Sequence, residues 1–247
     1  MIQITNNYTV REVIPGLFNV RSVPLGRELV HHNDTGIFQL GRLDHATLQK
    51  GALVKMHLHR DDEILSYMRT GTMQHKDSKG NDIAINNRHL MMMNAGSGIQ
   101  HEEAVQKAET VEMLQIFFRP RKDGLSPNVQ FHELPKAISE NKWRLIGGPQ
   151  ESEAPLKINS EVKLYDTLLK SHSITTPELN KNKVGLLYVF DGRATIQDGQ
   201  QDGQYIEKGT TIYFNQPLNI HTDTEAALVY FELDTKAQFS RNGMSTQ

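Results

Sequence analysis

The chain has 247 residues, enough for one large β domain or for two domains of ordinary size. Its 27 basic and 29 acidic residues leave it nearly neutral and without a long basic run, so we expect no direct binding to nucleic acid. The absence of cysteine excludes disulfides and thiol catalysis. Because neither a signal-peptide pattern nor an apolar run of bilayer length is present, we expect a cytoplasmic protein without a membrane segment.

Short extended segments dominate the first half of the chain. The pattern predicts strands over residues 10–13, 17–23, 37–40, 52–59, 63–69, 72–76, 82–85, 89–93 and 111–119. Turn-forming residues separate these strands at regular intervals, among them residues 77–81 and the pair Asn86-Asn87. Such spacing is typical of an antiparallel sandwich or barrel, so we predict an all-β fold.

Two pairs of metal-ligating side chains lie in this first half. His57 and His59 are two residues apart, and so are His101 and Glu103, so each pair shares one face of an extended strand. Three imidazoles and one carboxylate can hold a divalent first-row metal and still leave coordination positions open. This ligand mixture suits Fe(II), Mn, Ni, Cu or Zn better than Ca or Mg. The spacing therefore predicts a catalytic rather than a structural metal site.

The second half of the chain repeats the first. Residues 65–71 align with residues 186–192, and residues 91–94 align with residues 212–215, at the same separation of 186 − 65 = 121 positions. A match that keeps its register over this distance indicates a duplicated domain.

We predict a metal-binding domain over residues 1–135 and a second domain over residues 136–247, with a loop-rich connection around residues 121–160. In the second copy the four ligand positions are occupied by Glu178, Asn180, Thr222 and Thr224. The second domain is therefore expected to keep the fold without the metal site.

The ligand-bearing segments resemble a known family. Gly51, His57-Leu58-His59, Glu63 and Gly71 resemble the first motif of the cupin superfamily, and Gly98-Ile99-Gln100-His101 resembles the second. Residues 57–64, 75–81 and 94–103 further resemble the pirin family of bicupins. The resemblance implies two tandem cupin domains, antiparallel β-barrels of the jelly-roll type. The first would hold one divalent transition metal, commonly iron, through His57, His59, His101 and Glu103.

Two positions depart from the family pattern. Leu58 replaces the usual proline, and it faces away from the ligands. Glu102 replaces the serine commonly found between the last two ligands, and its carboxylate would either face solvent or change the charge near the pocket mouth.

The resemblance also implies an activity. Pirins are associated with quercetin 2,3-dioxygenase activity, in which O2 cleaves the ring of a flavonol, so we expect this oxidoreductase chemistry on flavonols or a related enediol. Glu103 is the ligand that could also leave the metal and act as general base. The alternative is a non-enzymatic, metal- and redox-sensing regulator that acts through a protein partner. A third interpretation, isomerisation of a sugar or keto acid, would need pocket cations such as Lys55 or Arg60.

Strand parity suggests which side chains line a substrate pocket. The candidates are Leu65, Tyr67, Met73, His75, Met91 and Met93. Most of them are expected to be ordinary core residues. His75 is expected to be structural, because no partner lies at metal-binding spacing from it in the sequence.

Overall fold

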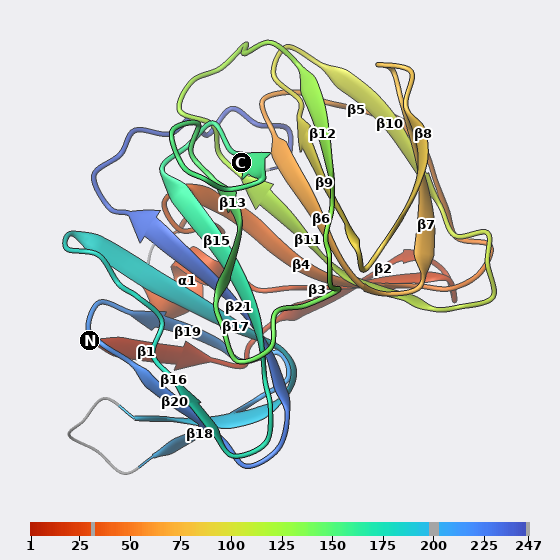
Figure 1. The fold of residues 1–247 in the computed structure, drawn as a ribbon. Coiled ribbons are helices and arrows are strands. Elements are labelled where there is room, and N and C mark those ends of the chain that lie inside the picture. The colour runs from red at the N-terminus through yellow and green to blue at the C-terminus, as the bar shows by residue number, and fades with distance from the viewer. Residues whose placement is uncertain (31–32, 198–202, 246–247) are drawn as a thin grey trace. The chain divides into compact units, whose positions relative to one another are not determined.

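The computed structural model describes residues 1–30, 33–197 and 203–245, and strands dominate the chain, as Figure 1 shows. The all-β prediction is confirmed. The chain folds into two compact units. The N-terminal unit comprises Asn7–Ala137, Leu156–Ser160 and Ala237–Gln247, and the C-terminal unit comprises Met1–Asn6, Ile138–Pro155 and Glu161–Lys236. The sequence predicted one boundary, after residue 135. In the structure, each unit also contains a short segment from the opposite end of the chain.

The N-terminal unit contains two antiparallel sheets. Its elements are β2 (Thr9–Ile14), β3 (Phe18–Ser22), α1 (Leu25–Leu29), β4 (Leu40–Leu48), β5 (Leu53–His59), β6 (Glu63–Thr70), β7 (Thr72–Asp77), β8 (Asp82–Asn86), β9 (His89–Asn94), β10 (Ile99–Ala104), β11 (Val111–Phe118), β12 (Asn128–Glu133) and β14 (Leu156–Lys157). One sheet has the order β12-β9-β6-β11-β4-β3-β2, and the other has the order β5-β10-β7-β8. The smaller sheet contains all four predicted metal ligands.

The C-terminal unit is also antiparallel. Its elements are β1 (Ile2–Thr5), β13 (Arg144–Gly148), β15 (Val162–Leu169), β16 (Ser173–Thr175), β17 (Lys183–Gln197), β18 (Gln204–Glu207), β19 (Thr211–Phe214), β20 (Asn219–Thr222) and β21 (Ala226–Asp234). Its main sheet has the order β1-β19-β17-β21-β15-β13, and β18 and β20 pair with the second half of β17. Within the described part of the chain, no helix combines the length and apolar character that crossing a bilayer requires.

The sequence repeat corresponds to a repeated strand pairing. In the N-terminal unit Leu65 of β6 pairs with Met92 of β9, and in the C-terminal unit Leu186 of β17 pairs with Tyr213 of β19. Both pairs are related by the same 121 positions, since 65 + 121 = 186 and 92 + 121 = 213. The two halves therefore share one strand register, as expected for a duplicated domain.

Glycine is needed at one repeated position because of its backbone conformation. Gly71 has φ +73° and Gly192 has φ +77°, a region that L side chains rarely adopt. A Cβ on Gly71 would also lie 2.8 Å from the carbonyl oxygen of Thr110, and one on Gly192 would collide with that of Glu225. The same turn therefore follows the equivalent strand in both units.

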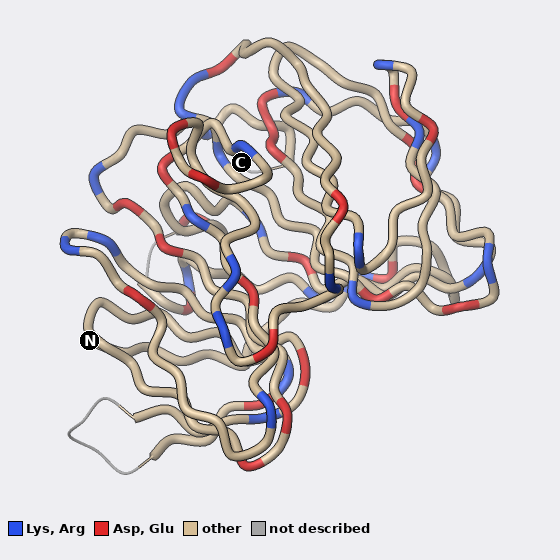
Figure 2. Tube along the Cα trace, viewed as in Figure 1, with Lys and Arg blue, Asp and Glu red and all other residues tan. Residues whose placement is uncertain are grey.

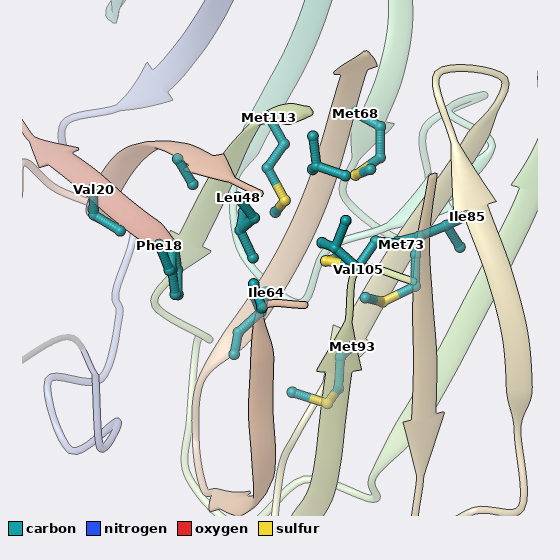
Figure 3. Packing of buried hydrophobic residues seen from close by; sticks show 14 of the residues in the cluster. Phe18, Val20, Leu48, Ile64, Met68, Met73, Ile85, Met93, Val105 and Met113 are labelled. Carbon is teal, nitrogen blue, oxygen red and sulfur yellow. The ribbon is translucent and has the colours of Figure 1, made fainter. Parts of the chain in front are cut away.

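Apolar side chains of alternate strand positions fill the inside of the N-terminal unit. Figure 3 shows Met68, Met73 and Met93 among this cluster, which also contains Ile64 and Phe117. Burial of these flexible and aromatic side chains supplies much of the driving force for folding, at roughly 25 cal/mol per Å² of apolar surface. The cluster adjoins the predicted metal ligands, because the ring centroids of His59 and Phe117 are 6.3 Å apart.

Aromatic rings fill the corresponding space in the C-terminal unit. Tyr230 stacks on Phe214 with ring centroids 5.8 Å apart and on Tyr165 at 5.5 Å. Gly185 makes room for this arrangement, because a Cβ at that position would collide with the ring of Phe214. Large aromatic rings thus fill the interior of the C-terminal unit, whereas the interior of the N-terminal unit contains buried histidines.

Candidate metal centre

Three histidines of the N-terminal unit point at a common centre. His57 and His59 come from β5, and His101 comes from the neighbouring strand β10, where it pairs directly opposite His57. The Nε2 atom of His57 lies 3.0 Å from Nε2 of His59 and 3.1 Å from Nε2 of His101. The strand alternation that predicted a shared face for these residues therefore brings their ring nitrogens together.

The hydrogen bonds of the outer ring nitrogens determine what the central nitrogens can do. Nδ1 of His57 donates to the carbonyl oxygen of Lys55 at 2.9 Å, and Nδ1 of His59 donates to Oδ2 of Asp62 at 2.9 Å. In a neutral imidazole the other nitrogen, Nε2, then carries a lone pair and no proton. Two such lone pairs 3.0 Å apart cannot form a hydrogen bond with each other. A shared cation satisfies both, so the donor set fits a metal ion.

Burial favours the neutral form of His57 and His101. Burial lowers the pKa of His101 to about 2, and the neighbouring His57, His59 and His75 act in the same direction. Burial also lowers the pKa of His57, and the nearby His59 adds to the effect. Both rings are therefore unprotonated at neutral pH, which is the state a metal ligand requires.

Glu103 is buried beside the histidines. It is 4% exposed, its Oε2 accepts a long hydrogen bond of 3.4 Å from Nε2 of Gln115, and its Oε1 has no partner. Burial raises the pKa of this carboxyl to about 7. Because an unpaired buried carboxylate is costly, either a proton or a cation is expected on Glu103.

The strand is irregular at this point. The pairing of β10 with β5 shifts register between His101 and Glu103, so that Glu103 pairs with Val54 of β5. On its other side β10 pairs with β7, where Glu103 lies opposite His75. Ligand atoms of His75, His101 and Glu103 all lie within 4.8 Å of one another, and those of His57, His59 and His101 form a second such group. The structure thus adds His75 to the cluster.

Sequence spacing missed His75 as a metal-site candidate because its neighbours come from another strand. The signal that could have found it is the short segment His75-Lys76-Asp77, in which His75 and Asp77 share one face. Nε2 of His75 donates to Oδ2 of Asp77 at 3.0 Å, inside a barrel that is otherwise largely apolar.

The C-terminal segment contacts the carboxylate behind His59. The backbone N–H of Ser245 donates to Oδ1 of Asp62 at 3.0 Å, while Oδ2 of Asp62 accepts from His59. The preceding residue, Met244, donates its N–H to the carbonyl oxygen of Arg60 at 3.1 Å. Both oxygens of Asp62 are thereby fixed, which orients the imidazole of His59.

Further contacts hold the same segment on the N-terminal unit. Asn242 donates from Nδ2 to Oδ2 of Asp123 at 2.6 Å, and Ser240 also hydrogen-bonds Asp123. Arg241 pairs with Asp34 at 3.2 Å, next to the buried Arg119. The segment therefore holds Asp62, and through it the ring of His59, in place.

Replacement of Asp62 by alanine tests this support. Asp62→Ala is expected to weaken binding of Zn(II) or Co(II) about 10- to 100-fold, because the His59 ring loses the acceptor that fixes its orientation. Competition with a chromophoric chelator measures the change. Asp61→Asn is the matched control, because the Asp61 side chain binds the N–H of Gly124 instead of a histidine. Equal metal affinity of Asp62→Ala and the control would contradict the prediction.

The predicted pocket residues divide between the two faces of their strands. Met73, Met91 and Met93 belong to the interior cluster with Ile64 and Met68. Leu65 and Tyr67 are equally buried, but they alternate with Ile64 and Met68 along β6 and face the other side of the sheet. Of the predicted pocket residues, the three methionines and His75 are the ones on the side of the metal ligands.

Glu102 lies on the opposite face of β10 from the ligands. With Gln74, Lys76 and Ala104 it lines a surface depression of about 460 Å³ that contains none of the four predicted ligands. Of the two positions expected for this carboxylate, the structure supports the one away from the metal centre. Figure 2 shows acidic and basic residues interspersed in both units, so that surface charges are mixed in sign.

The C-terminal unit uses the equivalent positions differently. Asn180 donates from Nδ2 to Glu232 at 2.8 Å, and the hydroxyl of Thr222 donates to the carbonyl oxygen of Lys170 at 2.9 Å. Over residues 1–30, 33–197 and 203–245, groups of three potential ligands occur in the N-terminal unit alone. Side chains that would be ligands in the first copy are replaced by hydrogen-bonding partners in the second.

Comparison with known proteins gives consistent results. The family model described as Pirin matches residues 27–118. Quercetin 2,3-dioxygenase of Escherichia coli O157:H7 is 26% identical over 202 residues, which are 81% of this chain and 85% of the relative. The pirin-like protein of Caulobacter vibrioides is 32% identical over 132 residues, covering 53% of this chain and 57% of the relative.

Solved structures share the fold. The crystal structure of YhhW from Escherichia coli has a TM-score of 0.80 at 22% identity and covers 94% of this chain and 97% of that chain. The complex of the same bacterial pirin with nickel(II) has a TM-score of 0.80 at 21% identity and covers 95% and 99%. This likeness confirms the prediction of two tandem cupin barrels.

Proposed function

Because this chain belongs to the pirin family of the cupin superfamily, we propose that it is a metal-dependent dioxygenase of the quercetin 2,3-dioxygenase type. The substrate class is flavonols or related enediols, with O2 as co-substrate. The observation that carries the proposal is the convergence of three imidazole Nε2 atoms at 3.0 and 3.1 Å beside a buried carboxylate without a partner. The Escherichia coli relative named quercetin 2,3-dioxygenase supports the reaction type.

His57, His59, His101 and Glu103 would hold one divalent metal. Nickel(II) is the ion in the bacterial pirin complex, and three imidazoles with one carboxylate equally suit Fe(II), which we propose first, or Mn, Cu and Zn. When bound, the metal would act as a Lewis acid that lowers the pKa of a substrate hydroxyl, and it would offer open coordination positions for substrate and O2.

The protein's own groups would handle the proton. Glu103 can accept the proton of the flavonol hydroxyl at a carboxylate oxygen. In the metal-free protein, burial raises the pKa of this carboxyl to about 7. Phe117 and Phe131 place apolar rings beside the histidines, with ring centroids 6.3 Å from that of His59 and 6.1 Å from that of His75 respectively. These groups favour proton transfer in a site of low polarity.

Oxygen consumption on addition of quercetin tests the proposal. Protein loaded with Fe(II), and in parallel with Ni(II), Mn(II), Cu(II) or Zn(II), is expected to consume O2 in a saturable, quercetin-dependent manner in at least one metal form. The metal-free protein is the control and should consume none. If no metal form supports turnover, the proposal is overturned and the alternative of a metal- and redox-sensing regulator with a protein partner is favoured.

A further inference from the structure

We propose that His75, His101 and Glu103 form a second metal-binding position within the N-terminal unit, a set of two histidines and one carboxylate. This position shares His101 with the group formed by His57 and His59, and it uses His75 in their place. The proposal concerns metal binding itself and does not rest on the identity of the substrate.

The position of β10 between two strands creates the second set. On one side β10 pairs with β5, which places His101 opposite His57. On the other side it pairs with β7, which places Glu103 opposite His75. This regular pairing with β7 brings a carboxylate oxygen of Glu103 close to ring nitrogens of His75 and His101. Side chains of β10 can therefore bind an ion with either neighbouring strand.

The spacing fits a metal ion. Ligand atoms of His75, His101 and Glu103 lie within 4.8 Å of one another. Two nitrogen or oxygen ligands at about 2.0 to 2.2 Å from one ion are at most about 4.4 Å apart, so small side-chain rotations suffice. Two histidines and one carboxylate on one side of an ion form the facial triad that is typical of Fe(II) sites with open positions.

Each of the three residues has an unsatisfied atom, and those of His75 and His101 are not explained by the first group. Nδ1 of His75, Nδ1 of His101 and Oε1 of Glu103 are all buried and without a hydrogen-bond partner. Buried polar atoms normally have partners, so three such atoms on one cluster need an explanation. An ion held among these residues supplies it when the proton of the neutral His101 ring is on Nε2, so His101 serves one of the two positions at a time.

His75 is oriented as a ligand would be. Its Nε2 donates to Oδ2 of Asp77 at 3.0 Å, so its Nδ1 carries the lone pair. Asp77 is itself held by the N–H groups of Lys79 at 2.9 Å and Asn81 at 3.1 Å and by the Asn81 side chain at 2.8 Å. A carboxylate behind the ring is the arrangement that fixes metal-bound histidines, and Asp62 provides the same to His59.

Removal of the His57 and His59 side chains isolates the proposed position. The variant His57→Ala/His59→Ala is expected to bind one equivalent of Co(II), more weakly than the unchanged protein and with a different visible spectrum. Adding His75→Ala is expected to lower the remaining affinity for Co(II) by about a hundredfold or more. Loss of a group that only supports a ligand already lowers metal affinity about 10- to 100-fold, and His75 would be a direct ligand. Chelator competition and the Co(II) absorption spectrum are the readouts.

A matched third substitution separates ligation from a packing effect. His45 is a buried histidine of β4 that pairs with Glu112 at 3.0 Å and belongs to neither ligand group. His57→Ala/His59→Ala/His45→Ala should therefore keep the Co(II) binding that the His75 variant loses. Binding of Co(II) that survives loss of His75, or is absent from a folded His57→Ala/His59→Ala protein, would overturn the proposal.

A single substitution covers the case in which the double variant does not fold. His75→Ala in the otherwise unchanged chain is expected to lower Co(II) affinity about tenfold and to change the Co(II) spectrum. His45→Ala should change neither. An unchanged affinity and spectrum in His75→Ala would refute the second position.

Discussion

Replacing His101 by alanine is expected to abolish transition-metal binding by this chain. His101 belongs to both groups of potential ligands, whereas His57, His59, His75 and Glu103 each belong to one. Loss of an outer supporting group costs about 10- to 100-fold in metal affinity, and loss of a shared direct ligand should cost more. Metal content after purification without chelator, and titration of the metal-free protein with Zn(II), measure the effect.

The C-terminal unit provides the control for this substitution. His221 of β20 lies one position from the residue equivalent to His101, and it pairs with Ile174 of β16 rather than with another potential ligand. His221→Ala is expected to leave the metal content unchanged. A His101→Ala protein that keeps one tightly bound ion would show that the metal site lies elsewhere.

Much of the fold could be predicted from local patterns. Period-two alternation located β6, β7, β9 and β11 within one or two residues, because their buried faces are apolar and their ends coincide with turn residues. The repeat at 121 positions predicted a duplicated domain, and in the structure Leu186 and Tyr213 pair as Leu65 and Met92 do, a long-range relation that local patterns do not reveal. Duplication supplied that long-range information.

The strand β4 was missed for a physical reason. The sequence predicted a strand over residues 37–40, but the strand begins at Leu40 and continues to Leu48. Its middle contains Arg42, Asp44 and His45, which break the apolar pattern and suggest an exposed loop. In the structure Asp44 accepts from Ser22 and pairs with Arg42, and both partners come from the local sheet. Partners of this kind cannot be recognised before the strands are paired.

The candidate site was predicted in part. Two-residue spacing placed His57 with His59 and His101 with Glu103 on shared faces, and the three histidines do converge. The assignment of these four residues as the ligands of one ion stays a prediction. The position of Glu103 opposite His75 depends on the pairing of β10 with β7, and the contact of Ser245 with Asp62 joins residues 183 positions apart. Neither leaves a periodic signal in the sequence.

Replacing Glu103 by glutamine is expected to lower quercetin turnover by about 10²- to 10⁴-fold while quercetin binding changes little. Glutamine keeps the shape of the side chain and an oxygen that can face the metal, but it cannot accept the substrate proton, and general base catalysis contributes about this factor. Single-turnover O2 consumption and quercetin titration, both on protein of verified metal content, separate the two effects. Equal losses in turnover and binding, or undiminished turnover, would refute the role of Glu103 as a base.

The pH profile of metal binding measures the role of Glu103 as a ligand. Burial raises the pKa of Glu103 to about 7, so the carboxyl of the metal-free protein carries a proton below that pH and loses it above. Metal binding requires the deprotonated oxygen, so metal affinity should rise as pH increases through this range. Glu103→Gln lacks the titrating group and should lose this step. A wild-type profile whose rising limb survives in Glu103→Gln would assign the titration to another residue.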